Sequence, residues 1–530
     1  MAAGSAVFWL ISPGLAVALA LRLRGWALVG LVPALSCGLV GAASLVAPRL
    51  GWNWGPAPIL VVIALAGGLA IAVTARQRAA ADARPGPAEG GLVRILGRRW
   101  PSGGWADTRR PAVVVTAGAS AVAFALGWAG LRSAGAIPQG WDAVFHGNLV
   151  RFILDTGNAS PLHAGTLNAP GSSWGYYPDV LHAIAALGPT STQVWPALNL
   201  TGLVATSLAW VGGAAYLASC LFQGRPAVLA AAAVVAVAVQ TGPAALVDQM
   251  PNALGLALLP GLLGCAAELL RGWSSTVPRG VMESAAGADT RSRAVMGARA
   301  AALLLGLGGA MAAHPGAAFS WAALVAPFAA KAWWTHLTAA WDSRRTVRAW
   351  AELMAPGLIA VLAGLVVWRS DLIRRMAESP GTPGRENPLA ALAEGLTDGW
   401  SMDGFRPNLL VLVGVSAGAL WCCRHRTARL LAVSHALALV LFVIAAAEWD
   451  WAAPITGFWF NDPNRLAGTL AVVVTPLTAA GLIALVHGWR AHRRERPSQG
   501  RIAPATHRTD RVWSAAGRLA LAAALVGGAL

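Results

Sequence analysis

Apolar runs of about twenty residues recur along nearly the whole chain and restrict its fold more than any other feature. A helix needs a run of that length to cross the hydrocarbon core of a bilayer. The chain has 530 residues, is 56% hydrophobic and carries only 12% charged residues, which excludes an ordinary soluble globular protein. We therefore predict an all-α fold, a polytopic transmembrane helix bundle of about 13–14 spans.

The predicted spans divide the chain into three regions. Residues 1–111 form a three-span segment with a basic loop, 112–488 form the main membrane module, and 489–530 form a second basic loop and a terminal span. Because the last apolar run continues to Leu530 without a polar tail, we expect a truncated or partial product. The spans cover about 5–22, 26–46, 57–75, 112–131, 194–219, 226–242, 251–270, 299–313, 316–334, 353–368, 408–422, 428–447, 465–488 and 514–530.

Arginine placement predicts the orientation of these spans. The net charge of +17 comes almost entirely from arginine, since Lys331 is the only lysine. The positive-inside rule assigns the arginine-rich loops to the cytoplasm. These loops are 76–111, 271–298, 335–352, 423–427 and 489–513. The long loop 132–193 then lies outside, and the positive charge needs no nucleic-acid partner. We predict a multi-pass protein of the cell membrane whose first partner is the lipid bilayer.

Rare polar side chains gather in the outer loop, beginning at Asp142. His146 follows four residues later, a spacing that places both side chains on one helix face. Phe145, Leu149 and their apolar neighbours continue the pattern, which predicts an amphipathic helix over 142–155 with Asp142 and His146 at its polar end. The alternative is that Asp142 only caps this helix, since Asp is a favoured N-cap residue.

A second polar group lies further along the same loop. Tyr176 and Tyr177, two of the chain's three tyrosines, precede Pro178, and a short helix then presents His182. Aromatic rings beside carboxylates and histidines suit the recognition of a sugar or a lipid phosphate. The alternative is an aromatic belt at the membrane interface.

Three further polar breaks fall on the same predicted side of the membrane. Asp248 lies between two spans and is either a site residue or an ordinary loop acid. His314 interrupts an apolar run after a helix of only about fourteen residues, too short to cross a ~30 Å core, so it either lines a cavity or is a hydrogen-bonded core histidine. Arg465 lies at an outer helix end, where its guanidinium suits a phosphate, unless it only pairs with Asp462.

At these positions the chain resembles the GT-C superfamily of membrane glycosyltransferases. The general character of its sequence is similar to that of the actinobacterial branch. The matching residues are Trp141-Asp142, His146, Gly157, Tyr177-Pro178 and His182. The resemblance implies a polyprenyl-phosphate-sugar donor and an essential acid in the first long outer loop, near the end of a membrane helix. Many members carry two adjacent acids there, whereas Ala143 follows Asp142. A divalent cation is therefore left open, and no other cofactor is predicted.

We hypothesise transfer of a sugar from a polyprenyl-phosphate donor to a glycan or lipid acceptor of the cell envelope, on the extracytoplasmic face. Asp142 would act as the catalytic base on the acceptor hydroxyl. The predicted substrate-binding residues are His146, Tyr176, Tyr177, His182, Asp248, His314, Asp462 and Arg465. A transporter or flippase of a lipid-linked sugar, or a non-catalytic subunit of an envelope-synthesis complex, remains as an alternative. Convergence of Asp142, His182, His314 and Arg465 on one outward-facing cavity would favour the enzyme.

Overall fold

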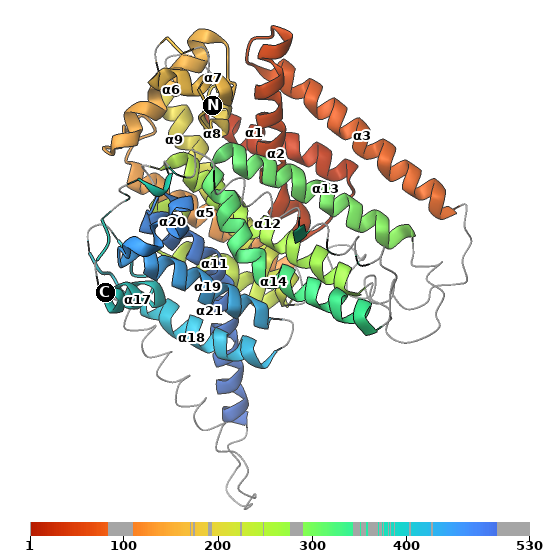
Figure 1. The fold of residues 1–530 in the computed structure, drawn as a ribbon, viewed down its shortest axis with the longest axis vertical. Helices are drawn as coiled ribbons and strands as arrows, with labels where there is room; N and C mark the ends of the chain where they lie inside the picture. Colours follow the sequence, from red (N-terminus) through yellow and green to blue (C-terminus); the bar gives the residue numbers. More distant parts are fainter. Residues whose placement is uncertain are drawn as a thin grey trace, which may run out of the picture.

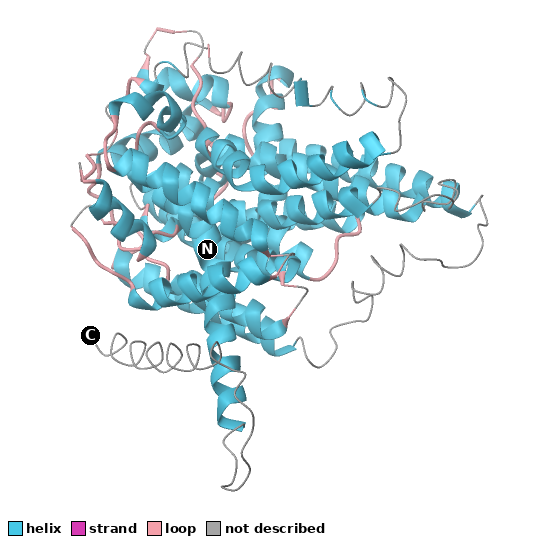
Figure 2. Ribbon diagram, turned by 60° about the horizontal axis from the view of Figure 1, so that its bottom comes forward, coloured by secondary structure: helices cyan, strands magenta, loops and turns pink. Residues whose placement is uncertain are grey.

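The computed structural model confirms an all-α chain. It describes residues 2–82, 110–169, 171–172, 175–188, 193–222, 225–246, 249–275, 290–342, 350, 387–401, 404–425 and 428–494, with scattered positions between 354 and 385. These described residues form helices joined by loops and turns, with no strand among them (Figure 2).

Long helices occupy the predicted spans. They are α1 (Ala2–Ala20), α2 (Trp26–Val46), α3 (Pro56–Asp82), α5 (Arg110–Leu131), α9 (Val194–Val204), α10 (Trp210–Leu221), α11 (Pro226–Ala238), α12 (Met250–Ser275), α13 (Thr290–Ala313), α14 (Pro315–Asp342), α18 (Leu409–Arg424), α19 (Arg429–Ala446) and α21 (Pro463–Arg494). A π-helical turn, η3 (Ala205–Ala209), joins α9 and α10 into one span. In the described part of the chain, 10 helices are long and apolar enough to cross a membrane. Helices α14 and α18 occupy two more predicted spans, while 514–530 and nearly all of 353–368 lie outside the described residues.

Short helices fill the loops between the spans. The outer loop folds into α6 (Trp141–Thr156), α7 (Pro161–Ala164), η2 (Gly165–Asn168) and α8 (Val180–Ala185), which lie together at one end of the molecule (Figure 1). The other short helices are η1 (Pro48–Leu50), η4 (Pro243–Ala245), α17 (Pro388–Leu396), η6 (Asp450–Ala452), α20 (Ala453–Thr456) and η7 (Gly457–Trp459).

Hydrogen bonds tie the connection between α2 and α3 to the outer loop at this end, which we call the loop end. The backbone N–H of Trp54 donates to the carbonyl of Gly157 over 2.7 Å, and its indole N–H donates to the carbonyl of Ala183 over 3.0 Å. Gly157 ends α6 in the left-handed conformation, φ 64°, which glycine adopts without strain. The opposite end carries the described arginines Arg22, Arg24, Arg271 and Arg424, and we call it the arginine-rich end.

Helix α2 lies at the centre of the bundle, so the first three spans belong to the same packed body as the later ones. Gly30 packs against the ring of Tyr216 on α10, and Gly38 against the backbone of Leu305 on α13. Small residues at these crossings let the helix backbones approach closely, which is how helices associate where lipid removes the hydrophobic driving force.

One of the closest crossings joins α18 to α21. Gly414 and Gly418, four residues apart on α18, face Gly481 on α21. A Cβ atom built on Gly481 would lie 2.0 Å from the carbonyl oxygen of Gly414 and 2.5 Å from the backbone nitrogen of Gly418. Because both neighbours are backbone atoms, neither can move aside without separating the helices.

We expect Gly481→Ala to destabilise the protein by about 1–3 kcal/mol, because the added methyl group forces two backbones apart. The measurement is the apparent unfolding temperature in detergent. Gly488→Ala is the matched control, since it lies on the same helix, is exposed, and has nothing within 4 Å of an added Cβ. Equal unfolding temperatures for the two variants would contradict the crossing.

A buried carboxylate at the loop end ties two loops together. Asp398 adopts φ 50° and accepts hydrogen bonds from the backbone N–H of Gln240 and from the N–H and hydroxyl of Thr241. Burial raises the pKa of Asp398 from its usual 3.8 to about 6, although these hydrogen bonds oppose the rise. Asp398 therefore titrates near neutral pH.

The raised pKa of Asp398 predicts that stability falls as pH rises from about 4 to about 6. In that window the unfolded chain releases the proton while the folded chain retains it, and the total loss is roughly 3 kcal/mol. Asp398→Asn cannot ionise, so its apparent unfolding temperature should fall less over the same pH range, whatever its absolute value. Parallel curves for the two proteins would exclude Asp398 as the titrating group.

Candidate functional site

Helix α6 presents Asp142 at the loop end. Asp142 is exposed in the first turn of the helix, where a carboxylate interacts favourably with the positive end of the helix dipole. The N-cap residue is Gly140, and no side chain caps this helix. The Asp142 side chain therefore does not cap this helix, and the Asp142 carboxylate is exposed.

His146 does not share the polar end of α6 with Asp142, contrary to the sequence prediction. It turns into the protein and is buried, as is His182 on α8. Nδ1 of His146 lies 3.1 Å from Nε2 of His182, so one ring donates a hydrogen bond to the other. Burial lowers the pKa of His182 well below its usual value, and the nearby His146 lowers it further. We infer that His182 is neutral and fixes the position of the His146 ring.

Tyr177 lies near both this histidine pair and Asp142. Its ring centroid is 4.5 Å from that of Phe145 and 5.9 Å from that of His182. Burial raises the pKa of Tyr177; the Asp142 carboxylate raises it further, and the Arg465 charge lowers it. The tyrosine hydroxyl is therefore protonated and can donate a hydrogen bond. Tyr176 differs, because nearly half of its side chain is exposed.

Asp179 is a site residue that the sequence did not indicate. Its position before α8 suggests an N-cap, yet its side chain makes no capping hydrogen bond. The residue is fully buried, and neither carboxyl oxygen has a hydrogen-bond partner in the structure. Burial raises the pKa of Asp179 well above its usual value, which favours the neutral carboxyl beside Tyr176 and Tyr177.

His314 lies between α13 and α14 and caps the second of these helices. The backbone N–H of Gly316 donates to Nδ1 of His314 over 3.1 Å. A neutral imidazole has one acceptor and one donor nitrogen, so the ring hydrogen lies on Nε2. Nε2 is 3.4 Å from Nη1 of Arg465, a guanidinium nitrogen that can only donate hydrogen bonds. In this tautomer both nitrogens therefore present N–H groups.

Arg465 is held in this position by Asp462. The carboxylate accepts hydrogen bonds from Nε of Arg465 over 3.2 Å, from the Gln249 amide over 2.8 Å, and from the backbone and side-chain amides of Asn464. Asp462 is buried, and these donors occupy its oxygens. It therefore orients Arg465 through Nε, and Nη1 of Arg465 lies beside His314.

A strained turn before α21 places the Phe460 ring against the guanidinium of Arg465. Phe460 and Asn461 both have positive φ angles, 60° and 52°, which non-glycine residues rarely adopt. The Phe460 ring lies 4.4 Å from the guanidinium carbon of Arg465. The Asn461 amide donates to the carbonyls of Ala377 and Ser379, which holds the turn in place.

We call the contacting residues Gln249, His314, Asp462 and Arg465 the cluster. Three long helices start directly after residues of this cluster. Helix α12 follows Gln249, α14 follows His314, and α21 follows Asp462. Helix N-termini carry partial positive charge and favour anions. Together with Arg465, they give the cluster a positive potential next to the Asp142 carboxylate, whose charge also acts on Arg465.

Most predicted site residues thus converge, with two exceptions. Asp248 lies outside the described residues, whereas its neighbour Gln249, which the sequence did not single out, contacts Asp462. Tyr176 lies near Asp179, but nearly half of its side chain is exposed.

A resident divalent cation does not fit this cluster. Asp142 has no second acid beside it, and the oxygens of Asp462 already accept hydrogen bonds. Within the described ranges, no group of three or more His, Cys, Asp and Glu side chains could hold a metal ion. We therefore derive no step through a metal.

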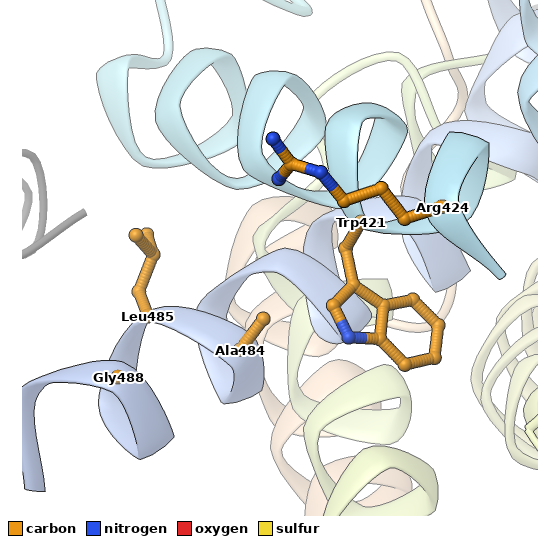
Figure 3. A pocket seen from close by; sticks show the side chains of 5 residues that line it. All are labelled: Trp421, Arg424, Ala484, Leu485 and Gly488. Atoms are coloured by element: carbon orange, nitrogen blue, oxygen red, sulfur yellow. The ribbon is translucent and has the colours of Figure 1, made fainter. Parts of the chain in front are cut away.

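Two pockets lie at the arginine-rich end rather than at the cluster. One, of about 120 Å³, is lined by Trp421 and Arg424 of α18 and by Ala484, Leu485 and Gly488 of α21 (Figure 3). The other lies between α1 and α3. Neither pocket is lined by a residue of the cluster, so neither is the outward-facing cavity that would favour the enzyme over its alternatives.

The fold and the cluster define a polytopic membrane protein with a buried polar site at one end of its helix bundle. The chain belongs to the family described as a family of unknown function, DUF6541, whose model matches residues 7–530. No curated protein and no solved structure matches the chain.

Proposed function

We propose that this protein is a membrane glycosyltransferase that moves a sugar from a polyprenyl-phosphate donor to a cell-envelope acceptor on the extracytoplasmic face. One observation carries the proposal. With Nδ1 of His314 accepting from Gly316, Nε2–H of His314 and an Nη1–H of Arg465 are two donors whose nitrogens lie 3.4 Å apart. One phosphate oxygen can accept hydrogen bonds from both groups, and the bond from the guanidinium is charge-assisted.

The same arrangement supports the departure of the lipid phosphate. Negative charge develops on the phosphate oxygen as the bond to the sugar breaks, and preorganised donors stabilise that charge. Asp462 and the Phe460 ring hold the guanidinium in place before the donor binds. The reaction therefore requires little rearrangement of Arg465.

Asp142 is the proposed general base. It is exposed to an entering acceptor, and its charge acts on both Tyr177 and Arg465, which puts the carboxylate and the phosphate site within electrostatic range of each other. Asp142 would take the proton of the acceptor hydroxyl as the oxygen attacks the sugar carbon. The protonated Tyr177 hydroxyl and the neutral Asp179 carboxyl would donate hydrogen bonds to the sugar.

The test is a transfer assay with the full chain in proteoliposomes. A panel of radiolabelled polyprenyl-phosphate sugars is supplied with an envelope-glycan acceptor, and both the labelled product and the sugar-free polyprenyl phosphate are measured. We expect both to form in equal amounts for one donor of the panel. If intact donor only changes leaflet, the protein is a flippase. If the protein neither cleaves nor moves any donor of the panel, the proposal is wrong and a non-catalytic subunit is favoured.

A further inference from the structure

The cleft between α1 and α3 at the arginine-rich end is separate from the proposed transfer site. It encloses about 590 Å³ and lies where α3 runs alongside the end of α1. Its walls include Leu19 and Ile71, each more than half exposed, and its mouth carries Arg22 and Arg24. Among the described residues, no acidic side chain lines this cleft.

A tight turn explains why both arginines point to the cleft. Helix α1 ends at Ala20 and α2 begins at Trp26, so five residues reverse the chain. Leu21 and Leu23 are buried in the core, which leaves the alternate residues Arg22 and Arg24 exposed. Arg22 adopts φ 60°, a left-handed conformation that the turn imposes.

We propose that this cleft binds an anionic phospholipid, with its phosphate headgroup at Arg22 and Arg24 and an acyl chain along Leu19 and Ile71. Exposed apolar walls between two membrane helices suit an acyl chain. Two arginines without an acidic neighbour in the cleft suit a headgroup with net negative charge rather than a zwitterionic one. Basic pockets between helices on the cytoplasmic side of a membrane bind anionic headgroups for the same reason.

The test uses native mass spectrometry of the full chain released from detergent. Phosphatidylglycerol and phosphatidylcholine with identical acyl chains are titrated separately. We expect the wild-type chain to bind phosphatidylglycerol more tightly than phosphatidylcholine. Removing one arginine in Arg22→Gln should weaken phosphatidylglycerol binding roughly fivefold, and removing the second in Arg22→Gln/Arg24→Gln should weaken it roughly fivefold again. Arg429→Gln is the matched control, because Arg429 is an exposed arginine at the same end, outside the cleft.

Three results would overturn the proposal. Equal binding of the two lipids by the wild-type chain would remove the headgroup preference, and this comparison does not depend on any variant folding. An equal effect of Arg429→Gln would indicate general attraction of the basic surface for anionic lipid. Displacement of phosphatidylglycerol by inorganic phosphate would indicate a free-anion site, without a role for the acyl chain. None of these results bears on sugar transfer.

Discussion

Replacing Asp142 with Asn is expected to reduce sugar transfer by about 10²–10⁴-fold, the usual contribution of a general base. The amide is nearly the same size as the carboxylate but cannot take a proton. Asp142 is exposed and caps no helix, so the variant should fold with an unchanged apparent unfolding temperature. Transfer is measured in proteoliposomes, and donor binding is measured in parallel, since binding should persist.

The chain offers a matched control on the same helix. Asp155 is also exposed, and it pairs with Arg151 over 2.7 Å in a surface ion pair of little energetic value. Asp155→Asn removes one negative charge from α6 without approaching the cluster, and transfer should be unchanged. If Asp142→Asn retains transfer, or if both variants lose it equally, Asp142 is not the base.

The fold was largely predictable because lipid imposes a simple rule on sequence. A span must be apolar over about twenty residues, so each described span follows from composition alone. The break at His314 was predictable for the same reason, since a polar residue and a proline interrupt an apolar run there. The helix over 142–155 followed from its periodicity and lies within α6.

The cluster was only partly predictable, because composition does not encode distance. Asp142, His314 and Arg465 were each identified as unusual in their surroundings, but nothing in the sequence places His314 beside Arg465, 151 positions away. The His146–His182 pair was missed for a related reason. The i, i+4 spacing associated His146 with Asp142, whereas burial against α8 separates them.

Some features had a sequence signal that pointed to a different role. Asp179 precedes a helix, where capping is the ordinary role of an aspartate, and only its complete burial distinguishes it. Gly414 and Gly418 have the spacing of a helix-packing motif, but the spacing does not identify Gly481 as their partner. In each case the decisive fact is what the residue contacts.

Replacing Arg465 with Gln is expected to weaken donor binding by roughly 10–100-fold, because a charge-assisted hydrogen bond to the phosphate is lost. Arg465→Lys should lie between Gln and the wild type, since an ammonium keeps the charge but cannot contact Asp462 and a phosphate through separate nitrogens. Binding is measured by titrating the polyprenyl-phosphate sugar, and transfer is measured at saturating donor.

A second variant separates this role from a purely structural ion pair. Arg465→Gln leaves Asp462 buried without its cationic partner, which lowers stability whether or not Arg465 binds phosphate. In Arg465→Gln/Asp462→Asn the unpaired charge is also removed, so the apparent unfolding temperature should recover toward the wild type. Donor binding should stay weak in this double variant, because the amides still supply no positive charge at Nε2 of His314. Recovery of binding together with stability would show that Arg465 acts only through its pairing with Asp462.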